Sequence, residues 1–217
     1  EKEFILNSFS SLVTTLGPLG KIKLGVHTEK SNDFITEKVY KSNSLLLGMI
    51  YDSRDNNLLP TFGTFLDMNF SIGFISNNNE LYNIGNINTI FSKYFLFNSS
   101  SFFYHMNWNQ VFIDKIDIPN QKKIRFGGAS SLRGYNEKEL IADWVIINTF
   151  EWSPIAMVNQ IAPYLFADYP ITNNSLAKMS YGIGIKNLNN NIYYNFSFSF
   201  SSILKNAKIH FTLTTLI

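Results

Sequence analysis

The sequence Phe126-Gly127-Gly128-Ala129-Ser130-Ser131-Leu132-Arg133-Gly134-Tyr135 interrupts a chain that otherwise alternates between apolar and polar residues. It lies inside residues 114–139, which lack the alternation typical of strands. Loops longer than about 12–15 residues are uncommon in compact domains and are often functional. The Gly-Gly and Arg-Gly pairs predict a backbone folded tightly around one cation, Arg133.

The composition favours a membrane β-barrel over a soluble domain. Of the 217 residues, 16% are aromatic and 16% are charged, whereas soluble domains carry about 25% charged residues. No apolar run approaches the ~20 residues that a membrane helix needs. These features suit a membrane barrel, although a soluble β-sandwich also fits. The net charge of +2 gives no reason to expect a nucleic-acid partner.

The ends and the cysteine count set a few further bounds. The chain begins at Glu1 without a visible signal peptide, so we expect a cut or processed N-terminus. There are no cysteines, which excludes disulfides and thiolate metal sites.

Period-two alternation predicts about eleven strands and no helix. The clearest example is 194–201, where aromatic residues alternate with Asn and Ser. In a barrel the polar face of such strands lines the lumen, and in a sandwich it faces solvent. The predicted strands are 4–15, 21–29, 45–51, 64–74, 82–97, 101–113, 141–152, 160–168, 179–186, 194–201 and 208–216.

The connections between these strands tend to alternate in length. Outer-membrane barrels have short periplasmic turns and longer outside loops. This parity places the long segments 30–43 and 114–139 on the outside, although 201–207 is short for an outside loop. The predicted short turns are 17–20, 98–100, 153–159 and 187–191, with 53–63 intermediate.

Two motifs resemble the bacterial surface-antigen superfamily of outer-membrane barrels. Tyr51-Asp52-Ser53-Arg54-Asp55-Asn56, followed by Pro60-Thr61 and Gly63, is similar to its periplasmic turn. Phe126-Gly127-Gly128 with Ser131-Leu132-Arg133-Gly134-Tyr135 resembles its signature loop, which folds into the lumen. Glu151 matches an acidic residue in the next strand, and Phe166-Ala167-Asp168 matches the start of a Phe-x-Asp-x-Gly strand, with Pro170 in place of the glycine.

The resemblance implies a fold and a function. The superfamily includes Bam-type insertases, Tam-type assembly factors and two-partner secretion transporters, which are not enzymes. We therefore expect a bacterial outer-membrane protein that assists insertion or translocation of polypeptides. Its expected partners are outer-membrane lipid, unfolded or secreted polypeptides, and other subunits of an assembly complex. Because family barrels have sixteen strands, residues 1–217 are expected to be the C-terminal portion of one transmembrane antiparallel up-and-down barrel, with the signature loop at about 115–138. The N-terminal strands and any POTRA domains are expected to be absent.

The resemblance also implies an internal latch. Arg133 is expected to point into the lumen and pair with Asp168 and Glu151, because a guanidinium forms bidentate hydrogen bonds with carboxylates. Without the resemblance, Arg133 reads as an ordinary solvated loop residue. The expected latch residues are Arg133, Gly134, Tyr135, Asp168 and Glu151, supported by the loop glycines Gly127 and Gly128.

The remaining motifs can be interpreted as structural elements or as functional sites. Asp52, Arg54 and Asp55, with Pro60 and Gly63, read as a turn that fixes strand register rather than as a metal or catalytic cluster. No nucleophile elbow or phosphate loop occurs, so we expect no enzyme, metal or cofactor. The alternatives are the membrane-anchoring barrel of a larger enzyme, such as a patatin-type lipase, and a soluble β-sandwich binding module. The three histidines lack ligand spacing, and five aromatic residues are candidates for interfacial belts: His27, His105 and His210; Trp144, Trp152, Tyr164, Tyr181 and Tyr194.

Overall fold

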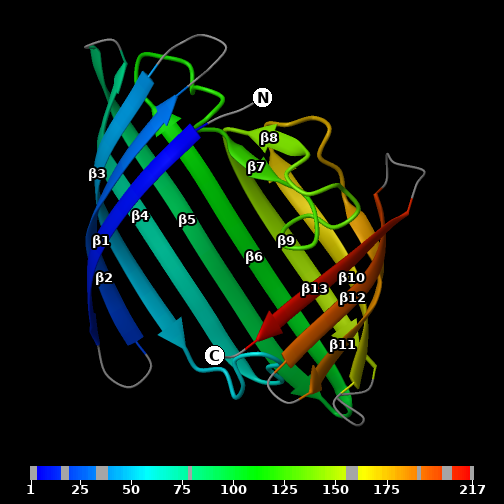
Figure 1. Cartoon of the computed structure of the whole chain (residues 1–217). Helices are drawn as coiled ribbons and strands as arrows, with labels where there is room; N and C mark the ends of the chain where they lie inside the picture. The colour runs from blue at the N-terminus through cyan, green and yellow to red at the C-terminus, as the bar shows by residue number, and fades with distance from the viewer. Residues whose placement is uncertain are drawn as a thin grey trace.

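The chain folds into one large antiparallel sheet and one small hairpin (Figure 1). The computed structural model describes residues 4–15, 20–32, 39–77, 80–154, 161–189, 192–201 and 207–215. The eleven strands of the large sheet follow sequence order, and β7 and β8 pair only with each other. The strands are β1 (Phe4–Thr15), β2 (Gly20–Asn32), β3 (Val39–Asp52), β4 (Gly63–Asn77), β5 (Glu80–Phe97), β6 (Ser100–Ile113), β7 (Ile124–Phe126), β8 (Leu140–Ala142), β9 (Trp144–Ser153), β10 (Ile161–Thr172), β11 (Ser180–Asn189), β12 (Ile192–Ser201) and β13 (Lys208–Thr215).

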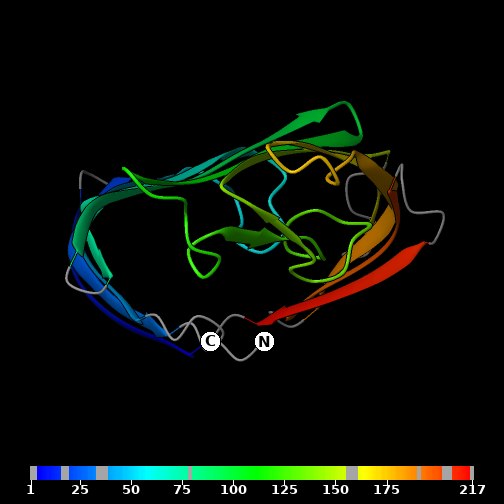
Figure 2. The same ribbon diagram turned by 90° about the horizontal axis from the view of Figure 1, so that it is seen from above.

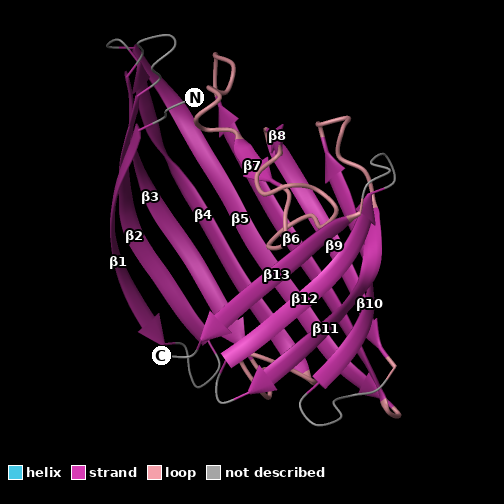
Figure 3. Ribbon diagram, turned by 45° about the vertical axis from the view of Figure 1, so that its right-hand side comes forward, coloured by secondary structure: helices cyan, strands magenta, loops and turns pink. Residues whose placement is uncertain are grey.

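The large sheet curls around an interior. Figure 2 shows β1 and β13, its two edges, on the same side of the molecule, and Figure 3 shows β11 to β13 across the interior from β5 and β6. In the described part of the chain, β1 and β13 do not pair with each other, so the barrel is not closed. This arrangement confirms the predicted all-β, up-and-down fold of eleven strands. The described strands form one curled sheet and one hairpin, and not the two packed sheets of the alternative β-sandwich fold.

The two faces of the sheet differ in polarity. On β4, the outward residues Phe70, Ile72 and Phe74 are 41–58% exposed, whereas the inward residues Ser71 and Ile75 are buried. An apolar exposed surface of this extent marks contact with a membrane or another protein. Among the described residues, no helix is long and apolar enough to cross a membrane. The same outward apolar character continues at Leu45, Leu47, Tyr181, Ile183, Ile185, Ile209, Phe211 and Leu213.

Several predicted strand ends were wrong. The connection expected at 30–43 is shorter, because β2 continues to Asn32 and β3 begins at Val39. Strand β10 continues past Asp168 and through Pro170. Its pairing with β11 stops at Asp168, while its pairing with β9 continues. Pro170 therefore sits where β10 is an edge, which is where a sheet tolerates proline. Parts of the turns predicted at 17–20, 153–159, 187–191 and 201–207, and residues 33–38, lie outside the described residues.

The strand predicted at 141–152 is in fact two strands. Asp143 separates β8 from β9: its carbonyl accepts a hydrogen bond from the Val111 N–H (3.0 Å), and its N–H donates to Asn173 Oδ1 (3.2 Å). Strand β8 turns away and pairs with β7, which lies inside the segment expected to be a loop. Residues 114–139, called the lumenal loop below, therefore contain a short strand that the alternation did not predict.

Candidate functional site

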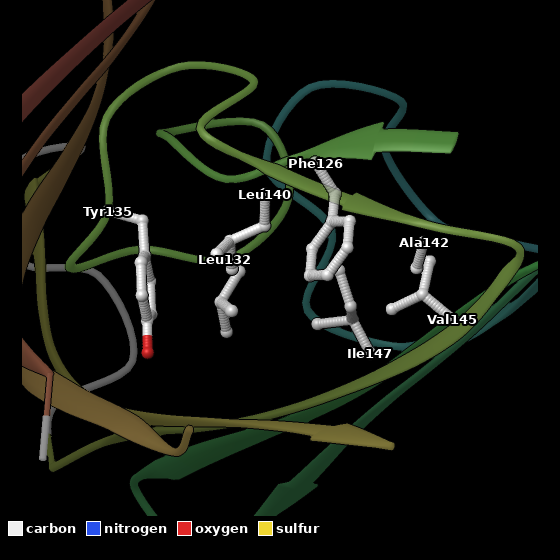
Figure 4. Close-up of a cluster of buried hydrophobic side chains, with 7 residues drawn as sticks. All are labelled: Phe126, Leu132, Tyr135, Leu140, Ala142, Val145 and Ile147. Atoms are coloured by element: carbon white, nitrogen blue, oxygen red, sulfur yellow. The ribbon is translucent and has the colours of Figure 1, made fainter. Parts of the chain in front are cut away.

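The lumenal loop lies inside the curled sheet (Figure 2), and its apolar side chains belong to a buried core. The core joins the loop and β8 to the inner face of β9, where Val145 and Ile147 are 0% and 2% exposed. Burial of such side chains stabilises a fold by about 1.5–3 kcal/mol each. Apolar packing therefore holds the loop against one wall of the interior. The cluster comprises Phe126, Leu132, Tyr135, Leu140, Ala142, Val145 and Ile147 (Figure 4).

Glycines are required where the lumenal loop turns back on itself. Gly127 and Gly128 have φ angles of 117° and 93°, which L side chains rarely adopt. A Cβ atom on Gly127 would lie 2.6 Å from the Asn136 carbonyl oxygen. The Gly127 N–H donates to Ser131 Oγ (2.8 Å), and the Gly128 N–H donates to the Leu132 carbonyl (3.0 Å). This tight turn brings the next residue, Arg133, to the barrel wall.

Arg133 is buried and forms charged hydrogen bonds with two strands. It is 6% exposed, and Asp168 and Glu151 are 0% and 8% exposed. Its Nε and Nη2 donate to the two oxygens of Asp168 at 2.8 and 2.6 Å, and its Nη1 donates to Glu151 Oε1 at 2.8 Å. The Arg133 backbone N–H also points to Asp168 Oδ2 (3.2 Å). These contacts to β9 and β10 are called the latch.

The charges of the latch are balanced. Lys186 on β11 pairs with the second oxygen of Glu151, so two cations face two carboxylates. Thr149 donates a further hydrogen bond to Asp168 Oδ1 (2.9 Å). Burial by itself would lower the pKa of Arg133, but Asp168 and Glu151 outweigh burial and raise it above its ordinary range. Arg133 therefore stays a cation. Removing one member of such a set leaves a buried charge unpaired.

An aromatic ring, that of Phe166, packs against the guanidinium of Arg133. The Arg133 Cζ is 3.5 Å from the ring centroid of Phe166, within the range of a cation–π contact. Gly182 faces Phe166, and Gly184 faces Tyr164, across the β10–β11 pair. The assignment of Tyr164 to an interfacial belt is wrong. Tyr164 is 4% exposed and its hydroxyl donates to Asn195 Oδ1 (2.7 Å), because it shares the inward face of β10 with Asp168.

The end of the lumenal loop contacts the last described strand. The Gly134 N–H donates to Nε2 of His210 on β13 (3.1 Å), and Lys208 Nζ donates to Asn136 Oδ1 (2.9 Å). The Tyr135 hydroxyl accepts a hydrogen bond from the Lys178 N–H (2.9 Å). The loop therefore contacts β9, β10, β13 and the segment between β10 and β11.

Sequence reasoning missed Thr149, Lys186 and His210 as members of this site. The alternation had placed all three on polar faces of their strands. Which of those polar residues meet Arg133 depends on strand register and on the depth that the loop reaches, and neither is encoded locally.

We expect Gly134→Ala to loosen the end of the lumenal loop. Gly134 has a φ of 89°, and an added Cβ would lie 3.1 Å from both Ser180 Cβ and the Ser201 backbone nitrogen. Holding a non-glycine residue in such a conformation costs about 1–3 kcal/mol. The expected result is faster proteolysis at Gly134–Asn136 in folded protein, with Ala129→Ser as the control. Equal cleavage rates in the two variants would contradict the prediction.

The predicted periplasmic turn is fixed by its own polar residues. Arg54 forms a bidentate pair with Asp52, with Nε–Oδ1 and Nη2–Oδ2 distances of 2.9 and 2.7 Å. Asp55 accepts hydrogen bonds from the Thr61 hydroxyl (2.5 Å) and N–H (2.9 Å). Gly63 has a φ of 112°, and a Cβ there would lie 2.3 Å from the Ser53 carbonyl oxygen. Each carboxylate is bound by a different group, and the described residues contain no cluster of three potential metal ligands.

The turn also reaches the interior. Leu59 is 6% exposed, and residues 58–60 line the same cavity as Arg133, Glu151 and Lys186. That cavity has a volume of about 230 Å³. The periplasmic turn and the signature loop, the two motifs that resemble the family, thus line the same cavity in the lumen.

We expect the Asp55 carboxyl to titrate below the ordinary aspartate pKa of about 3.9. Burial raises the pKa of Asp55, but the hydrogen bonds from Thr61 and Phe62 outweigh it and lower the pKa. The lowered pKa means that the ionised Asp55 stabilises the folded turn at pH values above the pKa of Asp55 in the unfolded chain. This stabilisation is lost as the pH falls through the lower pKa of Asp55 in the folded protein. Carboxyl ¹³C NMR titration tests this, and Thr61→Ala should raise the midpoint. A midpoint that Thr61→Ala leaves unchanged would contradict the assignment.

Comparisons with known proteins place this geometry in a family. The Omp85 superfamily domain matches residues 18–153, which is more than half of the chain. The match includes the turn, the lumenal loop and Glu151 but ends before Asp168. No curated protein matches the chain in sequence.

Two solved structures share the fold. CdiB from Acinetobacter baumannii is 16% identical with a TM-score of 0.69, over 97% of this chain and 41% of that chain. BamA from Haemophilus ducreyi lacking POTRA domains 1–3 is 12% identical with a TM-score of 0.76, over 97% of this chain and 53% of that chain. This chain thus spans about half the length of either protein. The family match and the fold confirm the resemblance predicted from the turn and loop motifs: this chain belongs to the Omp85 superfamily and forms part of an outer-membrane β-barrel.

Proposed function

We propose that this chain is part of a barrel that assists the insertion or translocation of polypeptides at the outer membrane, with the lumenal loop held by Arg133. The observation that supports the proposal most strongly is the buried latch. Omp85 membership and the folds of BamA and CdiB support the polypeptide-handling role. The expected partners are outer-membrane lipid, unfolded or secreted polypeptides and other subunits of a complex.

A positioning role suits the latch better than a chemical one. Its carboxylates are all bound to cations or hydroxyls, so none is left as a base or nucleophile. Its contacts join a loop to β9 and β10, and the adjoining Gly134 contacts β13. Displacing the loop would separate buried opposite charges, which is costly in an interior of low dielectric. The latch therefore sets the resting position of the loop.

The placement of residues 1–217 in a larger protein belongs to the same proposal. We take the described strands as the C-terminal portion of one barrel domain, located in the bacterial outer membrane. The exposed apolar outer face supports this location, since it suits contact with lipid acyl chains. Neither nucleic acid nor a cofactor is part of the proposed function.

Depletion of the whole protein in its own host tests the proposal. An insertion role predicts a fall in folded outer-membrane proteins, measured by heat-modifiable gel migration. A secretion role predicts normal barrels but loss of a secreted polypeptide from the medium. Re-expression of the wild type and of Arg125→Ala should restore either readout, whereas Arg133→Ala should not. If neither readout changes while a surface hydrolase activity is lost, the barrel is the membrane anchor of an enzyme and the proposal fails.

A further inference from the structure

The first part of the lumenal loop carries a second ion pair, away from the latch. Lys122 Nζ lies 2.8 Å from Oε2 of Glu29 on β2 and donates to Ser42 Oγ on β3 (3.1 Å). The Lys122 and Glu29 side chains are 7% and 14% exposed. An ion pair this sheltered from solvent differs from surface pairs, which contribute little because water and salt screen them.

Backbone hydrogen bonds within the loop position Lys122 beside the wall of the barrel that β2 and β3 form. The loop leaves β6 beside β5, where the Asp114 N–H donates to the Asn83 carbonyl (3.1 Å) and the Asn83 N–H donates to Asp114 Oδ1 (2.6 Å). A turn follows, in which the N–H groups of Lys122 and Lys123 both donate to the Pro119 carbonyl (2.8 and 3.2 Å). The lysine side chain is therefore held by a closed turn at its base and by Glu29 and Ser42 at its tip.

The two ion networks lie on different walls of the barrel. Strands β2 and β3 are near one end of the sheet order and β9 and β10 are toward the other, with β4, β5 and β6 between them. Figure 2 shows the loop crossing the interior, with the segment before β7 toward the blue strands and the segment after β7 toward the orange strands. We propose that Lys122 and Glu29 form a second anchor, so that the lumenal loop is fixed to both walls of the lumen.

The second anchor has a consequence that the latch alone does not have. Without the Lys122 pair, the turn at 119–123 would have no ion pair to β2 or β3, and it could move away from that wall while the latch stayed closed. With Lys122 paired as well, the loop leaves the lumen only when both ion networks open. A cavity of about 290 Å³ adjoins the anchor, and its lining includes His27, Glu29, Ser42 and Lys122. Removal of the lysine charge leaves Glu29 facing this space without its cation.

Lys123 is the matched control for Lys122. It is the neighbouring residue of the same type, and it pairs with Asp143 at 3.4 Å. Both side chains of that pair are about one third exposed, at 31% and 34%. If Lys122 is an anchor, a substitution of Lys122 should release the first part of the loop, whereas the same substitution of Lys123 should not.

Spin-label distances in the folded full-length protein test the anchor. Residues 1–217 contain no cysteine, and any cysteine elsewhere in the full-length protein is first replaced by serine. Asn120→Cys on the loop and Ile183→Cys on the outer face of β11 then introduce the labelling pair. Pulsed EPR should give one narrow distance distribution in the parent. We expect Lys122→Met, which keeps the length of the side chain, to broaden it about twofold through local release of the segment. Lys123→Met should leave it unchanged, and heat-modifiable migration verifies folding in each variant.

Substitutions at Glu29 complete the experiment. Glu29→Gln should broaden the distribution as Lys122→Met does, and the double variant should be no broader than either single variant, since both remove the same pair. The exchanged pair Lys122→Glu with Glu29→Lys should narrow it again. An unchanged distribution in Lys122→Met, or additive broadening in the double variant, would overturn the proposal. None of these readouts depends on transport, so they stand apart from the test of the proposed function.

Discussion

Arg133→Ala is expected to reduce the free energy of unfolding of the barrel by about 3–5 kcal/mol, the cost of removing one partner from a buried charge pair. The substitution leaves Asp168, which is 0% exposed, without the guanidinium that satisfies both of its oxygens. Lys186 still reaches Glu151, so the loss concentrates on Asp168. Urea unfolding in detergent or lipid vesicles, followed by heat-modifiable migration, measures the change.

Two companion substitutions separate this effect from a general effect of losing an arginine. Arg125 lies in β7 of the same segment and is exposed, so water screens its contacts and we expect Arg125→Ala to cost less than about 1 kcal/mol. Arg133→Lys keeps the charge but loses the planar fork, and it should fall between wild type and Arg133→Ala. If Arg133→Ala and Arg125→Ala both leave stability and function near wild type, Arg133 is not a latch.

Gly182→Val is expected to lower the yield of folded barrel and to cost at least about 3 kcal/mol, the upper part of the usual range for overpacking. A Cβ atom on Gly182 would lie 2.0 Å from the Phe198 carbonyl oxygen on β12 and 2.8 Å from the ring of Phe166. The first contact opposes β11–β12 pairing, and the second pushes Phe166 from beneath Arg133. The folded fraction on a heat-modifiable gel, and its urea midpoint, measure both effects.

The adjacent residue on β11 gives the control. Ile183 points outward and is 57% exposed, so Ile183→Val should change stability by less than about 0.5 kcal/mol. If Gly182→Val folds with the stability of Ile183→Val, the prediction is contradicted. Such a result would mean that β11, β12 and Phe166 shift at little cost to accommodate the valine.

Much of the barrel follows from local sequence. The side-chain period of a strand is two, so each alternating segment assigns its own inward and outward faces. This rule placed Glu151, Asp168, Lys186 and His210 on the polar faces of their strands, and the curl of the sheet makes those faces the inward ones. The glycines of 127–134 likewise predicted a tight turn, because positive φ angles disfavour other residues.

Strand ends did not follow from local sequence. The hairpin of β7 and β8 has three residues on each side, too few for a period to be visible. Strand β10 passes through Pro170 because its neighbour β11 has already ended, which is a property of the sheet. Asp143 breaks the strand predicted at 141–152 because Val111 and Asn173 take its backbone groups, and both are distant in sequence.

The sequence by itself determined that this chain forms about eleven strands, each with one apolar and one polar face. The expectation that Arg133 enters the interior came from the resemblance of its loop to the signature loop of the family. Only the tertiary structure decided the partners. Arg133 meets Asp168 and Glu151 because strand register sets them at one depth, while Lys122 meets Glu29 because the curl brings β2 round to the loop. A period of two fixes the face on which a side chain lies. It carries no information on which distant strand will stand opposite, since that depends on the closure of the whole sheet.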